Sequence, residues 1–185
     1  MRNSDCGDRR ERCMAADECG MRDSDTAWAV KVFMVQWTAE RVCSLESVLR
    51  SPNYLKWAAA LPPDVSADPL WRLTAYRLGV YLGDLAWADS RLLWRNSITR
   101  PVASQLYRAV WSIAANVAEG YSRASGRDRA RMFEYALGST REAAVWYKAG
   151  RPVLADETLS IRSATLAEIR RLLLVMVPVE RAKLR

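Results

Sequence analysis

Histidine is absent from the 185-residue sequence. Its absence removes the side chain that most often acts as a general base near neutral pH and most often binds a metal ion. Ser-His-Asp and Cys-His catalysis are therefore excluded, as are zinc sites that contain histidine. Paired acids and a glycine-rich phosphate loop are also missing, so we expect no enzyme activity and no cofactor.

Cysteine is scarce, and no two cysteines form a CxxC pair. The four are Cys6, Cys13, Cys19 and Cys43. Without a secretory signal, free thiols are expected rather than disulfides, with a four-cysteine zinc site as the minor alternative.

Long apolar runs are absent as well. The longest, LLLVMVPV at 172–179, is far shorter than the ~18 residues that span a bilayer, and Pro178 interrupts it. The N-terminus lacks the apolar region of a signal peptide. We therefore expect a cytoplasmic protein with no membrane contact.

Lysine is rare, so the positive charge is carried almost entirely by arginine. The net charge of +7 is uneven: residues 66–185 carry nineteen basic and eleven acidic residues, against nine and ten in residues 1–65. A GC-rich genome would explain part of the arginine excess. Otherwise, a basic domain favours an anionic partner, most simply nucleic acid.

The first 65 residues are predicted to be an N-terminal extension. Residues 1–27 have no apolar periodicity and are interpreted as disordered or as an over-extended start. A short helix is predicted over 38–50, interrupted by Pro52. The string LPPDVSADP at 61–69 is predicted to be a linker whose prolines exclude regular structure.

Residues 66–185 show four helical periods, with apolar side chains three and four positions apart. The first begins at Asp68-Pro69 and the second at Thr99. Their expected buried stripes are Trp71, Thr74, Leu78, Tyr81, Leu85, Ala88 and Leu92, and then Val102, Leu106, Ala109/Val110, Ile113 and Val117. Gly120 is predicted to end the second helix in a left-handed conformation.

The third helix is predicted to start with a cap from Ser125 to Asp128 and to end at Gly150 and Pro152. The stripes of the third and fourth helices are Met132, Ala136, Ser139, Ala143 and Trp146, and then Leu166, Ile169, Leu173 and Met176. Gly138 predicts the close approach of a neighbouring helix. The pattern therefore predicts an all-α fold, an antiparallel up-down four-helix bundle over 66–185 with an N-terminal extension over 1–65.

Two motifs, QLYRAVWSIAANVAEGYSR and FEYALGSTREA, resemble the small proteins encoded by intervening sequences in 23S ribosomal RNA genes. The resemblance covers about residues 68–180 and lies in Gln105, Arg108, Ser112, Asn116, Glu119-Gly120, Gly138-Ser139 and Glu142. It implies a helical bundle that assembles as a cyclic homo-oligomer, often a pentamer. A related bundle is the accessory protein of diversity-generating retroelements, a basic pentamer that partners a reverse transcriptase. The extension and the arginine content depart from the family pattern.

Asn116 and Glu119 share one face near the end of the second helix, and no further catalytic group accompanies them. We interpret them as polar groups that set the register between helices or subunits. The expected partners are Glu142 and Arg141 on the third helix, or Arg108 two turns earlier on the second. Because a buried carboxylate must be paired, we expect an Arg–Glu link.

Four arginines, Arg123, Arg127, Arg129 and Arg131, cluster at the turn between the second and third helices. They form either a solvated turn or a phosphate-binding site, for which the planar guanidinium is well suited. The start of the third helix would add partial positive charge.

Eight tryptophans are many for this length, and Trp87, Trp94 and Trp111 lie outside the predicted stripes. Contact between subunits, ordinary core packing and base stacking are the alternatives. The sequence thus predicts a non-enzymatic oligomeric bundle that binds RNA or DNA through a basic surface without strong sequence specificity. The alternative is an adaptor that docks a partner enzyme, for example a reverse transcriptase, and binds no nucleic acid.

Overall fold

The computed structural model describes residues 46–183, and every regular element in this range is a helix. The predicted all-α class is therefore confirmed. The interpretation of residues 1–27 and most of the helix predicted over 38–50 lie outside the described residues. No helix within 46–183 combines the length and the apolar character that crossing a bilayer requires.

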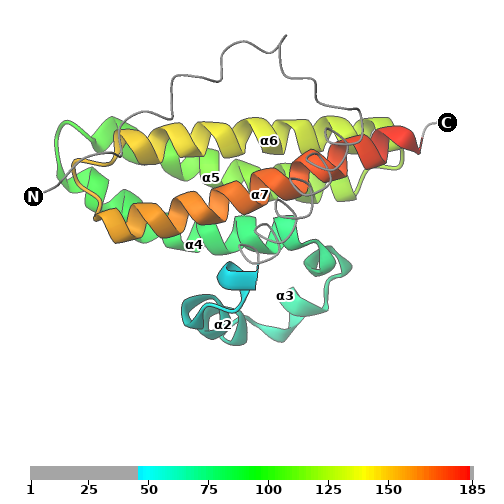
Figure 1. Cartoon of the computed structure of the whole chain (residues 1–185), viewed down its shortest axis with the longest axis horizontal. Coiled ribbons are helices and arrows are strands. Elements are labelled where there is room, and N and C mark those ends of the chain that lie inside the picture. The colour runs from blue at the N-terminus through cyan, green and yellow to red at the C-terminus, as the bar shows by residue number, and fades with distance from the viewer. Residues whose placement is uncertain (1–45, 184–185) are drawn as a thin grey trace, which may run out of the picture. The chain divides into compact units, whose positions relative to one another are not determined.

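Four long helices make up most of the described chain (Figure 1). They are α4 (Thr74–Arg95), α5 (Arg100–Tyr121), α6 (Gly126–Ala149) and α7 (Asp156–Ala182). The helix α5 packs against α4 and α6, and α7 packs against α6 and α4. The Ser125 cap is confirmed, because its Oγ accepts a hydrogen bond from the Asp128 backbone N–H at 3.0 Å. Gly150 ends α6 as predicted.

Residues 46–49 are helical, and three further short helices, each starting with a proline, precede the long ones. They are α2 (Pro52–Ala59), α3 (Pro63–Ala67) and the 3-10 helix η1 (Pro69–Arg72). The prediction that 61–69 excludes regular structure is wrong, because a proline in the first turn loses no intrahelical hydrogen bond. Asp68 does cap a helix, accepting from the Leu70 N–H at 2.8 Å, but the helix is η1 and α4 starts at Thr74.

The helix α2 packs on α4 through aromatic side chains. Tyr54 is 5% exposed and meets the ring of Tyr81 edge-on, with 5.1 Å between the ring centroids. The Trp57 ring also contacts Tyr81, and its indole N–H donates to Asp84 Oδ2 at 2.8 Å. Part of the predicted extension therefore shares the hydrophobic core of the long helices.

The buried stripe of α4 differs from the predicted one in its second half. Ala88 and Leu92 are exposed, whereas Ala86, Asp89 and Leu93 are buried. Both sets have helical spacing, so the spacing alone did not distinguish them. The structure selects the set containing Asp89, because this carboxylate has partners on other helices. In α6, Thr140 and Tyr147 are likewise buried in place of Ser139 and Trp146.

Two predicted roles of glycine are wrong. Gly120 lies inside α5, which continues to Tyr121, and is buried. A Cβ at Gly120 would lie 2.7 Å from Cε1 of Phe133, so the glycine permits α6 to approach α5. Gly138 was expected to permit such an approach, yet no atom of another described helix lies within 4 Å of its Cβ position.

Candidate functional site

The arginine turn between α5 and α6 is largely neutralised by acidic side chains. Arg123 forms an ion pair with Glu119, and Arg131 Nη2 lies 3.2 Å from Asp128 Oδ1. Arg129 Nε donates to Glu180 Oε2 of α7 at 2.8 Å. Arg127 is the only one of these four arginines without a carboxylate partner among residues 46–183. The turn therefore presents less free positive charge than the sequence predicts.

Among residues 46–183, the side chains of the four predicted polar contacts do not join one helix to another. The Asn116 side-chain amide donates to the backbone carbonyl of Ser112 at 2.8 Å within α5, and Glu119 pairs with Arg123 in the turn that follows α5. Glu142 accepts from the indole N–H of Trp146 within α6. Arg108 is exposed, without a carboxylate partner in residues 46–183. A role for these residues between subunits stays a prediction.

A buried network centred on Asp89 links three helices instead. Asp89 Oδ2 accepts from Arg162 Nε of α7 at 2.8 Å and from the Tyr147 hydroxyl of α6 at 2.9 Å. Asp89 Oδ1 accepts from Arg162 Nη2 at 3.2 Å. Burial and the neighbouring carboxylate raise the pKa of Tyr147 well above its usual value. The phenol therefore stays protonated and serves as a donor, and the network positions α4, α6 and α7.

A groove with a basic lining runs between α6 and α7. Its volume is about 390 Å³ around Arg141 and Arg170, and it continues into a second hollow of about 410 Å³ around Lys148. Ala144 and Ser163 line both hollows. The remaining lining residues are Thr140, Leu166, Ala167, Tyr147, Arg151, Asp156, Leu159 and Ser160.

Most of the positive charge in this groove is uncompensated. Arg141, Lys148 and Arg170 form no ion pair with any described carboxylate, whereas Arg151 lies 4.0 Å from Asp156 at one end. Two of these cations could have been found in the sequence, because Arg141 and Lys148 are seven positions apart and share a helix face. Arg170 could not, because only the packing of α7 on α6 brings it there.

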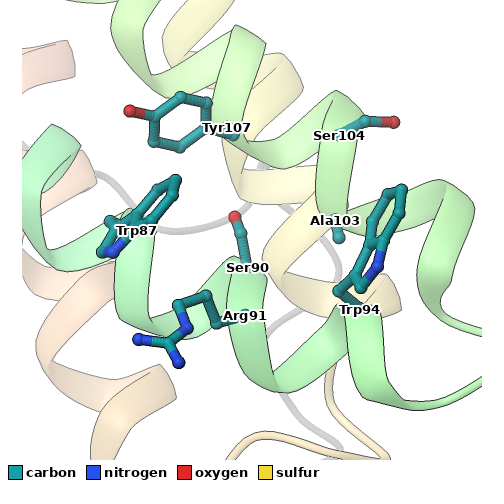
Figure 2. A pocket seen from close by; sticks show the side chains of 7 residues that line it. All are labelled: Trp87, Ser90, Arg91, Trp94, Ala103, Ser104 and Tyr107. Atoms are coloured by element: carbon teal, nitrogen blue, oxygen red, sulfur yellow. The ribbon is translucent and has the colours of Figure 1, made fainter.

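A second groove, between α4 and α5, is apolar (Figure 2). Its volume is about 330 Å³, and Trp87, Ser90, Arg91, Trp94, Ala103, Ser104 and Tyr107 line it. Trp87 and Trp94 are 58% and 56% exposed, which is high for tryptophan. Trp111 differs: its ring packs where a Cβ at Gly83 would lie 2.7 Å away, and its indole nitrogen is buried.

These features define an all-α protein that has a basic groove and an apolar groove on its long helices. Residues 94–174, from the end of α4 into α7, match the model of the family described as 23S rRNA-intervening sequence protein. The match supports the family resemblance seen in the sequence and includes both sides of the basic groove. A comparison with curated proteins gives no match to this chain.

Proposed function

We propose that this protein is a non-enzymatic, antiparallel up-down four-helix bundle that binds the phosphate backbone of nucleic acid along the α6–α7 groove. The observation that carries the proposal is the uncompensated charge of Arg141, Lys148 and Arg170. Guanidinium groups bind phosphate oxygens in a bidentate manner, and a lysine adds a point charge. The hydroxyls of Ser160 and Ser163 supply further donors of the kind that contact phosphates.

Binding through such a groove would be tolerant of sequence, because phosphate contacts carry no base information. Structured RNA is the first ligand to test, because the matching family is named after an intervening sequence of ribosomal RNA. The arginine turn is the weaker candidate surface, since three of its four cations have acidic partners.

The test is to titrate labelled structured RNA and duplex DNA at low and at moderate salt. Counterion release predicts a steep loss of affinity as salt rises, with a slope of about −0.7 to −0.9 for each phosphate neutralised. Replacing Arg141, Lys148 and Arg170 with glutamine should weaken binding and reduce that slope by about 2 to 3. The matched control, Arg123→Gln/Arg127→Gln/Arg131→Gln, removes equal charge from the turn.

Equal losses in the two triple variants would show that net charge, rather than the groove, governs binding. A larger loss of affinity in the control variant would indicate that the arginine turn, rather than the groove, binds the nucleic acid. Absence of binding at low salt would overturn the proposal and favour the adaptor function.

Self-association is the second candidate property, favoured by an apolar strip on α7. Leu174, Val175 and Val179 are 51%, 57% and 50% exposed. Arg171 nearby is bound to Glu168, so this cation does not oppose contact between two copies, whereas Arg170, one turn before Leu174, stays unpaired among residues 46–183. The family resemblance favours a ring such as a pentamer. Light scattering measures the molar mass of the particle in solution, and we expect Val175→Asp to lower it. A wild-type protein that is monomeric at a concentration on the order of tens of micromolar would refute self-association.

A further inference from the structure

We propose that the α4–α5 groove docks an acidic amphipathic helix from a partner protein. The inference concerns a surface separate from the basic groove and does not depend on nucleic-acid binding. Its basis is the shape of the groove, the fixed orientation of its two exposed tryptophans and the charge around it.

The groove has the length and lining that a short helix requires. Trp87 and Trp94 are seven positions apart on α4, which corresponds to two helical turns or about 10.5 Å. Figure 2 shows them at opposite ends of the groove, with Ser90 and Ala103 between them. A partner helix with apolar side chains at positions i, i+3, i+4 and i+7 would place them between and beside the two indoles.

Each tryptophan is already held by a neighbour. The rings of Trp87 and Tyr107 meet at an interplanar angle of 62° with their centroids 5.9 Å apart. The Arg100 guanidinium lies 5.6 Å from the centroid of Trp94, and its Nε donates to the Trp94 carbonyl oxygen at 3.2 Å. Binding therefore requires little ordering of these side chains, which are of the types that dominate interface energies.

The charge around the groove is mainly positive, with exposed Asp84, one turn before Trp87, as the acidic exception. Arg91 lines it, and Arg95 follows one turn later on α4; Arg100 and Arg108 lie one turn to either side of Ser104 on α5. None of these four arginines forms an ion pair with a carboxylate in the described part of the chain. A partner with acidic residues beside its apolar stripe would compensate this charge.

The same charge argues against a two-fold contact between two copies through this groove. Two identical grooves facing each other would bring the two arginine sets together. In a ring the groove would meet a different surface of the next copy, and the oligomer mass of the tryptophan variant tests that arrangement. Single-stranded nucleic acid is also disfavoured. Base stacking needs a free ring face, and the Arg100 guanidinium already lies over the ring of Trp94.

The experiment uses the full-length protein and three labelled synthetic peptides of about four helical turns. One carries leucines at the i, i+3, i+4, i+7 positions flanked by glutamates, the second carries lysines in place of the glutamates, and the third is a scrambled form of the first. Fluorescence anisotropy measures their affinities. We expect the glutamate peptide to bind and the lysine and scrambled peptides to bind at least about tenfold more weakly.

Two variants and one control connect that binding to the groove. Trp87→Ser/Trp94→Ser changes exposed side chains and should reduce affinity about tenfold or more without altering the unfolding curve. Arg91→Glu/Arg95→Glu should reverse the preference, so that the lysine peptide binds better. Tyr135→Ser, at a 55% exposed aromatic residue of α6, should leave both affinities unchanged.

Four outcomes would overturn the proposal. Peptide binding that is insensitive to the tryptophan change, or a charge preference that does not reverse, places the contact elsewhere. A fall in oligomer mass in Trp87→Ser/Trp94→Ser without peptide identifies a second copy as the occupant. Competition by a uridine oligonucleotide that depends on both tryptophans identifies single-stranded nucleic acid.

Discussion

The buried Asp89 network gives the sharpest test of how the long helices are held together. The Asp89 side chain is 4% exposed and that of Arg162 is 11% exposed, so the two charges face each other with little solvent screening. The substitution Asp89→Asn keeps the shape of the side chain and removes its charge. Arg162 would then be buried without a compensating anion, which costs about 3–5 kcal/mol of unfolding free energy.

A double substitution distinguishes the loss of a charge partner from the value of the pair itself. Asp89→Leu/Arg162→Met removes both charges and retains apolar volume, and comparable replacements are often neutral or stabilising by about 1–4 kcal/mol. Tyr147→Phe deletes one donor to the carboxylate and should cost about 1.5–3 kcal/mol. Glu119→Gln, at the exposed Arg123 pair, is the matched control and should cost no more than about 1 kcal/mol.

Urea unfolding followed by circular dichroism measures these free energies. A cost below about 1 kcal/mol for Asp89→Asn would refute the argument. Domains of this size have only about 5–15 kcal/mol of stability, so a buried unpaired charge should lower it measurably. A loss of stability in Asp89→Leu/Arg162→Met that equals the sum of the losses in Asp89→Leu and Arg162→Met, measured separately, would also refute the argument.

Three further predictions concern two glycines and one carboxylate. Gly120→Ala should destabilise the protein by about 1–3 kcal/mol, because its Cβ would lie 2.7 Å from the buried Phe133 ring; an unchanged melting temperature would contradict this. Gly138→Ala fills open space on a helix and should stabilise by about 0.5–1 kcal/mol; a loss of stability together with a lower oligomer mass would instead place Gly138 at a subunit contact. Partial burial opposes ionisation of Glu180, but hydrogen bonds from Lys183 and Arg129 outweigh it and lower its pKa. The contribution of Glu180 to the free energy of unfolding is therefore present above the pKa that its carboxyl has in the unfolded chain. It is lost as pH falls through the lower pKa of the folded protein, so stability should fall less steeply with acidification in Glu180→Gln.

The sequence predicted the elements that local chemistry determines. The all-α class, the Ser125 cap and the end of α6 at Gly150 follow from periodicity and from the preferences of single residues. The choice of buried stripe on α4 could not be predicted in this way. Leu92 is apolar and lies on the exposed side, whereas Asp89 is polar and buried because Arg162, seventy-three positions away, pairs with it.

The candidate sites show the same division between local and distant determinants. The cluster Arg123–Arg131 is conspicuous in sequence, yet Glu180 reaches it from α7 and removes part of its charge. The α6–α7 groove has no contiguous signature, because Arg141 and Arg170 meet only through the packing of two helices. The exposed tryptophans were predicted to lie outside the core stripes, and the structure separates Trp87 and Trp94 from the more enclosed Trp111.

The packing of α2 on α4 has a consequence for how this chain can change in evolution. Composition suggests a break near residue 65, as though the segment before it could be gained or lost freely. Tyr54, however, belongs to the same core as Tyr81, and Trp57 is bonded to Asp84. Deleting α2 would leave the Tyr81 ring and its neighbours facing water, so substitutions on α4 that restore a polar surface would have to come first. A helix that shares the core in this way is difficult to lose in evolution, because its deletion would expose core residues whether or not the helix contributes to binding.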